Sequence, residues 1–528
     1  MKFKSVVDTC VLAVASLLIL SPVSLAVSAA TPTPTPVLTP RSAPISAAFF
    51  GMDVNHLLAG TPWPTLSFGT LRLWDTGTLW GNLNPSQGTY SWANLDSQIA
   101  LAKSNNVGIL YTFGGTPAWA IPTNIGIQSI SRTSGVVTVT TTTPHGVYYS
   151  SLRAATSQTQ ITIVGVSDPS FDGTFYLTGT PNATTFSYAL SAPDASSSGG
   201  TMSAVCGGVY TGSSSCSQAA ANMSDWDSYV AALVTHVGPG VIKYWEMWNE
   251  ANLPGFWEGD LPTLINMNSV ARKIIKANDP NAIILSPSNT IDFALQSVCD
   301  YFNGKTAPDG STMNLCGSTW LKDYLQEGGG SYVDAIAFHG YPELTESPES
   351  ILGMIELQEN AMAANGVGNL PLLDTESSWG TDVGVPATSD QVAFLARHLI
   401  LEQSAGLQHT VWYAYDNSEW GTLYTAAGGL NAVGTAYGLL YTWLTGATLT
   451  QACAVTASNS VVYVCQYSRP WGYKALIVWT TSGTSVFQLP NNAWFPHYRD
   501  LYGNITNLAA QSVPISTSPI LVETSSDF

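Results

Sequence analysis

Charged residues are scarce in this sequence, and basic residues are the scarcest. Only 10% of the 528 residues are charged, and 17 Lys and Arg stand against 35 Asp and Glu, which gives a formal net charge of −18. Proteins bind nucleic acids and anionic membrane surfaces through clustered Lys and Arg. The composition therefore argues against a nucleic-acid partner and directs attention to uncharged ligands.

Cysteine is scarce as well, and its spacing matches no common metal site. The chain has seven cysteines, no CxxC motif and no Cys/His cluster with the spacing of zinc ligands. We therefore expect no metal and no cofactor. Six cysteines form three pairs of sequence neighbours, which predicts local disulfides in an oxidising compartment, although fifteen connectivities are possible. The predicted pairs are Cys206–Cys216, Cys299–Cys316 and Cys453–Cys465.

Long apolar runs are absent except at the N-terminus. Residues 1–30 resemble a secretory signal peptide, with Lys2 and Lys4, the run "VLAVASLLIL" and the small residues "AVSAA". This run is short for a membrane-spanning helix, although an uncleaved anchor is an alternative. Residues 31–45 form a Thr/Pro-rich linker that we expect to be extended. The sequence thus predicts an exported protein that is secreted, periplasmic or attached to the cell surface.

Aromatic residues, in contrast, are abundant. The chain contains 17 Trp and 23 Tyr. Many of these rings must be core, but an acidic chain of low charge and high ring content also suits neutral ligands that stack on aromatic faces. Carbohydrates fit this description.

Between residues 46 and 447, short apolar segments alternate with helix-like segments. Eight buried strands separated by helices predict a (β/α)8 barrel, an α/β fold. A doubly wound sheet is the alternative, but no GxGxxG motif follows the first strand. The expected strands are 49–56, 70–77, 107–115, 241–249, 282–288, 333–341, 370–377 and 409–417.

Two regions depart from this alternation. Residues 126–205 are rich in Thr, Ser, Val and Gly with a period of two, which predicts a small all-β module inserted after the third strand. The module could be decorative or could contact substrate. Residues 448–528 show similar alternation, and we expect a C-terminal β-sandwich there.

In a (β/α)8 barrel the chemistry lies at the carboxyl ends of the strands. Polar and aromatic residues occupy those ends, including two glutamates, Glu250 and Glu376. A pair of carboxyl groups suffices for glycoside hydrolysis, one as proton donor and the other as nucleophile or base. The further candidates for substrate binding are Asn55, Arg72, Trp119, Asn249, His339, Tyr341, Trp379 and Trp412.

Three motifs resemble those of glycoside hydrolase clan A: "WNEAN" after the fourth strand, "FHGY" at the sixth and "DTESSWG" at the seventh. Within that clan the chain is most similar to family 39 and its relatives. The resemblance implies a retaining mechanism with Glu250 as acid/base and Glu376 as nucleophile. It also implies that Asn249 binds the sugar 2-hydroxyl and that Trp412 is a stacking platform.

The resemblance further implies that Arg72, His339 and Tyr341 orient the nucleophile and shape the sugar subsite. One position departs from the clan pattern, because the usual proline after Asn-Glu is Ala251 here. This change puts the subfamily in doubt but not the role of Glu250.

The proposed roles carry physical requirements. Retention requires the two carboxyl groups to lie about 5–5.5 Å apart. Glu250 must stay protonated, which burial favours, and Glu376 must be ionised, which hydrogen bonds from Arg72 or Tyr341 would favour. Glu246 is expected to be structural and paired with Arg72. The rival interpretation is a non-catalytic carbohydrate-binding or cell-surface protein on a degenerate barrel.

Overall fold

The computed structural model describes nine stretches of the chain: 43–149, 158–207, 215–253, 255–290, 317–342, 346–379, 387–455, 462–491 and 493–525. The signal peptide, most of the Thr/Pro linker and the predicted Cys299–Cys316 pair lie outside the described residues. Within them, no helix is long and apolar enough to cross a membrane.

The central body is a (β/α)8 barrel, as predicted. Its eight parallel strands follow one another around the sheet, and bridges Leu285–Ala335 and Thr290–His339 join the first and last strands of the sheet order. The strands are β1 (Phe50–Asp53), β2 (Thr70–Leu73), β3 (Gly108–Thr112), β13 (Tyr244–Glu246), β14 (Ile283–Leu285), β15 (Ile336–His339), β16 (Leu372–Ser377) and β17 (Thr410–Trp412). They coincide with the eight predicted segments but are shorter.

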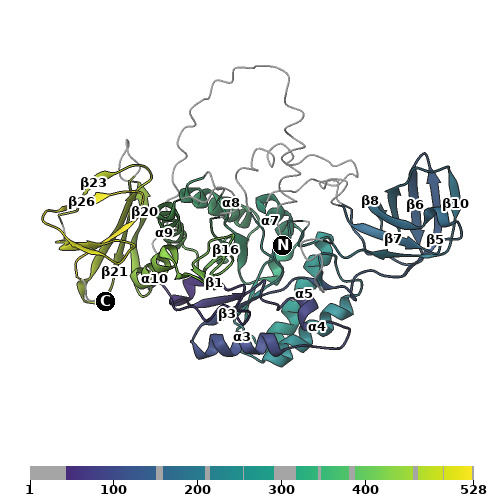
Figure 1. Cartoon of the computed structure of the whole chain (residues 1–528), viewed down its shortest axis with the longest axis horizontal. Helices are drawn as coiled ribbons and strands as arrows, with labels where there is room; N and C mark the ends of the chain where they lie inside the picture. Colours follow the sequence, from purple (N-terminus) through teal and green to yellow (C-terminus); the bar gives the residue numbers. More distant parts are fainter. Residues whose placement is uncertain are drawn as a thin grey trace, which may run out of the picture.

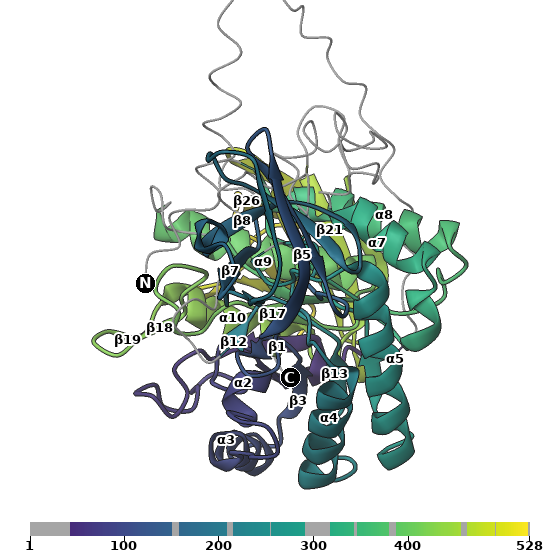
Figure 2. The same ribbon diagram turned by 90° about the vertical axis from the view of Figure 1, so that its right-hand side faces the viewer.

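Helices cover the outside of the barrel. They are α2 (Trp80–Leu83), α3 (Ala93–Ser104), α4 (Met223–Val237), α5 (Leu261–Asn278), α7 (Gly317–Gln326), α8 (Ile351–Ala364), α9 (Thr388–Ala405) and α10 (Ala432–Leu444). Local sequence sets their ends: Asp260 caps α5 by accepting from the Thr263 N–H at 2.7 Å, and Gly406 ends α9 with a φ of 94°. Figure 2 shows α4 and α5 side by side, where the Trp226 indole donates to the Met267 carbonyl.

The barrel interior has an apolar floor and a polar upper layer. The floor consists of Leu110, Tyr244, Leu285, Ala335, Ala337 and Leu373, all buried. Inward-facing side chains nearer the carboxyl ends of the strands are polar and include Arg72, Thr112, Glu246 and Thr375, each at 0% exposure. The packed floor supports this polar layer from below, which holds its side chains in fixed positions.

Two β modules flank the barrel on opposite sides (Figure 1). Strands between residues 125 and 204 form a seven-stranded antiparallel sheet, which additional β5–β6 pairing closes on itself, around a separate apolar core. Its strands are β5 (Ile125–Thr133), β6 (Val136–Thr141), β7 (Gln160–Val164), β8 (Gly173–Asn182), β9 (Thr185–Ala189), β10 (Ala195–Ser197) and β11 (Thr201–Ala204). The module joins the barrel beside the short pair β4 (Thr116–Pro117) and β12 (Ser215–Cys216), where the predicted Cys206–Cys216 disulfide is present.

The C-terminal module has a six-stranded and a two-stranded sheet enclosing a third core. Its strands are β20 (Thr448–Val455), β21 (Val462–Ser468), β22 (Lys474–Thr480), β23 (Ser485–Gln488), β24 (His497–Arg499), β25 (Ile505–Asn507), β26 (Ser512–Ile515) and β27 (Ile520–Glu523). The predicted Cys453–Cys465 disulfide joins β20 to β21. A hydrogen bond from the Cys453 N–H to the Ser404 hydroxyl at 2.8 Å ties this module to α9.

Candidate active site

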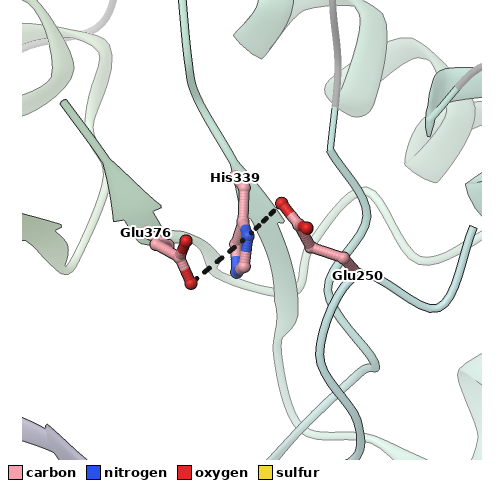
Figure 3. Close-up of side chains that lie close together, drawn as sticks. All are labelled: Glu250, His339 and Glu376. Carbon is pink, nitrogen blue, oxygen red and sulfur yellow. Dashed lines mark hydrogen bonds and ion pairs between the residues drawn. The ribbon is translucent and has the colours of Figure 1, made fainter. Parts of the chain in front are cut away.

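The two predicted catalytic glutamates meet at the carboxyl end of the barrel. Glu376 lies within β16, and Glu250 lies in the loop four residues beyond the end of β13. His339, the last residue of β15, stands between them (Figure 3). An oxygen of Glu250 and an oxygen of Glu376 are within 4.8 Å of each other. Both side chains are nearly buried, with exposures of 8% and 7%.

Arg72 connects most of the polar residues in the site. Its Nη1 donates to Oε2 of Glu376 at 2.6 Å, and its Nη2 donates to Oδ1 of Asn249 at 2.6 Å. Nε and Nη2 both donate to Oε2 of Glu246, at 3.1 and 3.0 Å. The planar guanidinium, itself fully buried, thereby fixes three side chains from two strands and one loop.

Glu246 supports the site from below, as predicted. In addition to Arg72, it accepts hydrogen bonds from the hydroxyls of Thr112 at 2.5 Å and Thr375 at 2.6 Å. Burial opposes its ionisation, but Arg72, His339 and these two hydroxyls outweigh burial and lower its pKa. Glu246 is therefore an ionised structural carboxylate that balances the charge of Arg72.

Glu376 is surrounded by groups that favour its ionised form. Tyr341 donates to Oε1 at 2.7 Å, and Arg72 occupies Oε2. Burial raises the pKa of Glu376 above its usual value, while His339, Arg72 and the Tyr341 hydroxyl act in the opposite direction. Of the two glutamates, Glu376 alone contacts Arg72 directly in the described hydrogen-bond network, so it is the one that ionises first.

Glu250 is held in the opposite state. Burial raises its pKa to about 8, with the negative charges of Asp75 and Glu246 adding to that rise and Arg72 opposing it. Its hydrogen-bond partner is His339, whose Nδ1 lies 2.9 Å from Oε1 of Glu250. Glu250 is thus protonated at neutral pH, as general-acid chemistry requires.

His339 lies between Arg72 and Glu250. Its Nε2 is 3.4 Å from Nη2 of Arg72, and its Nδ1 is 2.9 Å from Oε1 of Glu250. Burial lowers the pKa of His339, which favours the neutral ring. The short contact with Nδ1 fixes the position of the Glu250 carboxyl group.

The loop that carries Glu250 has unusual backbone geometry. Trp248 has a φ of 148° and Glu250 a φ of 39°, both in the region that L-residues seldom adopt. Such conformations cost of order 1–3 kcal/mol each and are concentrated at functional sites. Hydrogen bonds from Glu250 N to the Ser288 hydroxyl and from Ala251 N to the Ser288 carbonyl hold this backbone in place.

The structure does not place Trp412 where the sequence predicted. Its side chain is 1% exposed, its indole N–H donates to the Gly421 carbonyl at 2.7 Å, and its ring faces His398 on α9. The outward-facing position on β17 explains this, because neighbouring strand residues alternate between the barrel interior and the helices. A sugar platform at Trp412 is inconsistent with this burial.

The remaining predicted residues lie further from the two glutamates. Asn55 accepts from Asn417 Nδ2 at 3.0 Å at the end of β1. Trp119 donates to the Asn84 carbonyl and meets the edge of Trp80, and Trp379 stacks on Phe394 at 4.5 Å. All three are half-buried near the carboxyl ends of strands, but the contacts described here are with the scaffold.

Sequence reasoning missed several residues in the site. Thr112 and Thr375 hold Glu246, Asp75 and Tyr413 hydrogen-bond to each other beside the two glutamates, and Trp420 meets the edge of Tyr341 with ring centroids 5.3 Å apart. Asp75 lies two residues beyond β2 and Tyr413 directly follows β17, so their position at strand ends could have identified them. Trp420 lies in a loop, where strand patterning gives no signal.

Within the described stretches of the chain, two groups of side chains have the composition of metal ligands. The first is Glu250, His339 and Glu376, and the second is Asp374, His398 and Glu402, between β16 and α9. The first group contains the positive charge of Arg72 at 2.6 Å from Glu376, which disfavours a second cation. In the second group, burial raises the pKa values of both carboxyl groups.

Comparisons with known proteins agree with this architecture. No protein-family model and no curated protein sequence matches the chain. Among solved structures, a family 39 glycoside hydrolase from the gut symbiont Bacteroides cellulosilyticus WH2 has a TM-score of 0.53 at 15% identity, covering 87% of this chain and 76% of that one.

Two further solved structures match over nearly their whole length. A glucosidase from Croceicoccus marinus has a TM-score of 0.53 at 11% identity, covering 93% of this chain and 98% of that one. A family 39 β-xylosidase from Caulobacter crescentus has a TM-score of 0.52 at 15% identity, covering 92% and 98%. At these identities the matches establish a shared fold alone.

Proposed function

We propose that this protein is a retaining glycoside hydrolase, with Glu376 as nucleophile and Glu250 as acid/base. The observation that carries the proposal is the pair itself: two carboxyl oxygens lie within 4.8 Å of each other, Glu376 accepts from Arg72 at 2.6 Å, and burial raises the pKa of Glu250 to about 8. Inverting enzymes need room for a water between carboxyl groups about 6.5–9.5 Å apart. The matched solved structures are named as glycosidases, and the sequence motifs resemble those of clan A. Both observations support the same interpretation.

The chemistry proceeds in two displacements. Oε1 or Oε2 of Glu376 attacks the anomeric carbon while Glu250 donates its proton to the departing glycosidic oxygen, which yields a glycosyl ester and a free alcohol. Glu250, now ionised, then takes a proton from water, whose oxygen attacks the same carbon and releases Glu376. Arg72 and Tyr341 keep the nucleophile oriented, and His339 orients the acid.

Asn249 is placed to bind a hydroxyl of the sugar being cleaved. Its Oδ1 is occupied by Arg72, which fixes the plane of the amide next to Glu250. The resemblance to clan A assigns this asparagine to the 2-hydroxyl, and the fixed amide agrees with such a role. Since the N-terminal sequence indicates export and two disulfides are present, the substrate is a glycan outside the cytoplasm.

The test uses three variants of the purified protein on a panel of glycosides and polysaccharides. Glu376→Gly should lose activity by about 10³-fold or more and recover part of it with added azide, which replaces the missing nucleophile. Glu250→Gln should lose activity mainly on substrates with poor leaving groups, which need the proton. Glu327→Gln, an exposed glutamate just beyond α7, is the matched control and should retain full activity.

The stereochemistry of the first product gives an independent check. Proton NMR of the initial product should show the anomeric configuration of the substrate retained. Net inversion, or full activity in either catalytic variant, would contradict the mechanism. Glycan binding without turnover of any substrate would instead favour the non-catalytic carbohydrate-binding protein.

A further inference from the structure

A third acidic residue lies at the rim of the same site. Asp75 follows β2 by two residues, is exposed, and has a φ of 55°, a conformation that few L-residues other than Asn and Asp adopt. Its charge raises the pKa of Glu250, which shows that the two carboxyl groups lie within electrostatic reach of each other. The chain turn after β2 thus places a carboxyl group at the same end of the barrel as Glu250 and Glu376.

Tyr413 holds Asp75 in this position. The Tyr413 hydroxyl donates to Oδ2 of Asp75 at 2.7 Å, and Asn417 Nδ2 approaches that hydroxyl at 3.4 Å. The backbone N–H of Tyr413 donates to the Ser377 carbonyl, next to Glu376 in β16. Trp74, Phe256 and Tyr413 belong to one apolar cluster beside Asp75. Sugar-binding sites combine aromatic side chains with fixed hydrogen-bond acceptors. The aromatic rings stack on the sugar ring, and the acceptors bind its hydroxyl groups.

The charge around the site restricts which sugars it can take. Asp75, Glu250 and Glu376 are all acidic, and among the described residues Arg72 is the one Lys or Arg whose charge acts on the pKa of both Glu250 and Glu376. Arg72 has an exposure of 0%, and Glu246, Glu376 and Asn249 occupy its N–H groups. Its Nη1 also lies 3.6 Å from Oδ2 of Asp53. Because the guanidinium is buried among three carboxyl groups of the protein, it is poorly placed to bind a carboxylate on the substrate.

We propose, building on the glycosidase function above, that Asp75 accepts hydrogen bonds from hydroxyl groups of a neutral sugar and makes the site reject uronides. A uronide carboxylate near Asp75 would meet a like charge with no cation to compensate it, which costs free energy on binding. A neutral sugar instead offers hydroxyl donors to a carboxyl group that Tyr413 fixes. Burial raises the pKa of Asp75, while the Tyr413 hydroxyl and Arg72 act against that rise and favour the carboxylate, the stronger acceptor.

The experiment measures kcat/KM on substrates that differ only at C6. The probes are the 4-nitrophenyl α- and β-glucosides with the matching glucuronides, the galactosides with the matching galacturonides, and neutral and uronide polysaccharides for internal cleavage. The wild type should prefer neutral substrates by about 100-fold or more. Asp75→Asn removes the charge without changing the shape, and should lower kcat/KM on neutral substrates by about tenfold or more and reduce the preference at least tenfold.

Two further variants separate specificity from folding. Asp227→Asn removes one negative charge from the exposed face of α4 and should change neither rate. Tyr413→Phe keeps the ring but releases Asp75, and should shift the preference in the same direction as Asp75→Asn. The proposal would be overturned if the wild type cleaved uronides at the same rate as neutral sugars, or if the preference were unchanged in both Asp75→Asn and Tyr413→Phe. Either result would leave the glycosidase function intact. No turnover of any probe would overturn both.

Discussion

Arg72 and Glu376 form the shortest link between the barrel interior and the catalytic pair, with Nη1 and Oε2 2.6 Å apart. Because Arg72 also holds Glu246 and Asn249, the position of the proposed nucleophile depends on a structural carboxylate from β13 that never meets substrate. Glu250, in contrast, is linked to a neutral histidine. Because their partners differ, Glu376 and Glu250 differ in how readily they ionise.

Replacing Arg72 should therefore damage both stability and activity. In Arg72→Lys a single ammonium replaces the planar fork and cannot satisfy Glu246, Glu376 and Asn249 together. We expect the free energy of unfolding to fall by about 3–5 kcal/mol, because buried charges lose partners. The matched control is Arg272→Lys, at a half-exposed contact with Asp334, which should cost about 1 kcal/mol or less. Urea denaturation of both variants measures the difference, and equal losses would contradict this account.

Tyr341→Phe should change the pH profile more than the stability. The variant removes the 2.7 Å hydrogen bond that helps to lower the pKa of Glu376. Since the nucleophile must be ionised, a higher pKa moves the acidic limb of the kcat/KM profile to higher pH, with a roughly tenfold lower maximum. Tyr502→Phe, at an exposed tyrosine, is the control. An acidic limb at the wild-type pH would show that Tyr341 does not act on Glu376.

The sequence predicts the fold well because the barrel strands are buried on both sides. Segments such as "VGILYTF" are mostly apolar and are separated by helices, and this pattern depends mainly on burial. Glu250 and Glu376 are identifiable because each lies near the carboxyl end of a predicted strand and within a motif that resembles glycoside hydrolase clan A. Their convergence at one end of the barrel follows from the parallel arrangement of the strands.

The sequence does not predict which side of a strand each tryptophan faces near its end. The fourth strand was predicted over residues 241–249, but β13 ends at Glu246. A regular strand over the predicted range would place Glu246, Trp248 and Glu250 on one face. Beyond it, Trp248 packs against Trp226 and Trp257 in the core outside the barrel, while Glu250 faces the site. The irregular backbone after the strand decides this, and a periodicity of two cannot describe it.

Glu250 should make the protein less stable as the pH rises. Burial raises its pKa from 4.5 to about 8, so the folded state keeps a proton that the unfolded state releases. The stability from this group is complete below pH 4.5 and is lost as the pH rises through about 8. Glu250→Gln has no proton to release, so the melting temperature of the variant minus that of the wild type should increase from pH 5 to pH 9. Glu327→Gln should show no such trend, and a constant difference for Glu250→Gln would contradict the raised pKa.

Activity should follow the same titration. Glu250 must be protonated to donate to the glycosidic oxygen, so the basic limb of the kcat/KM profile should lie near pH 8. Substrates with good leaving groups, such as 2,4-dinitrophenyl glycosides, need little protonation and should show a weaker basic limb if the first displacement limits the rate. A basic limb that is identical for good and poor leaving groups would assign it to another residue.

Trp412 and Trp420 should respond to substitution in opposite ways. Trp412 is buried against α9, so Trp412→Phe should lower the free energy of unfolding by about 1–3 kcal/mol and leave KM within about twofold of the wild-type value. Trp420 is half-buried with its ring against Tyr341, where it can contact a bound sugar. Trp420→Ala should therefore raise KM by about tenfold with a smaller loss of stability. Thermal unfolding and steady-state kinetics of the two variants distinguish a core residue from one that stacks on substrate. If KM rises in Trp412→Phe and not in Trp420→Ala, then Trp412 is the stacking residue, as the sequence predicted.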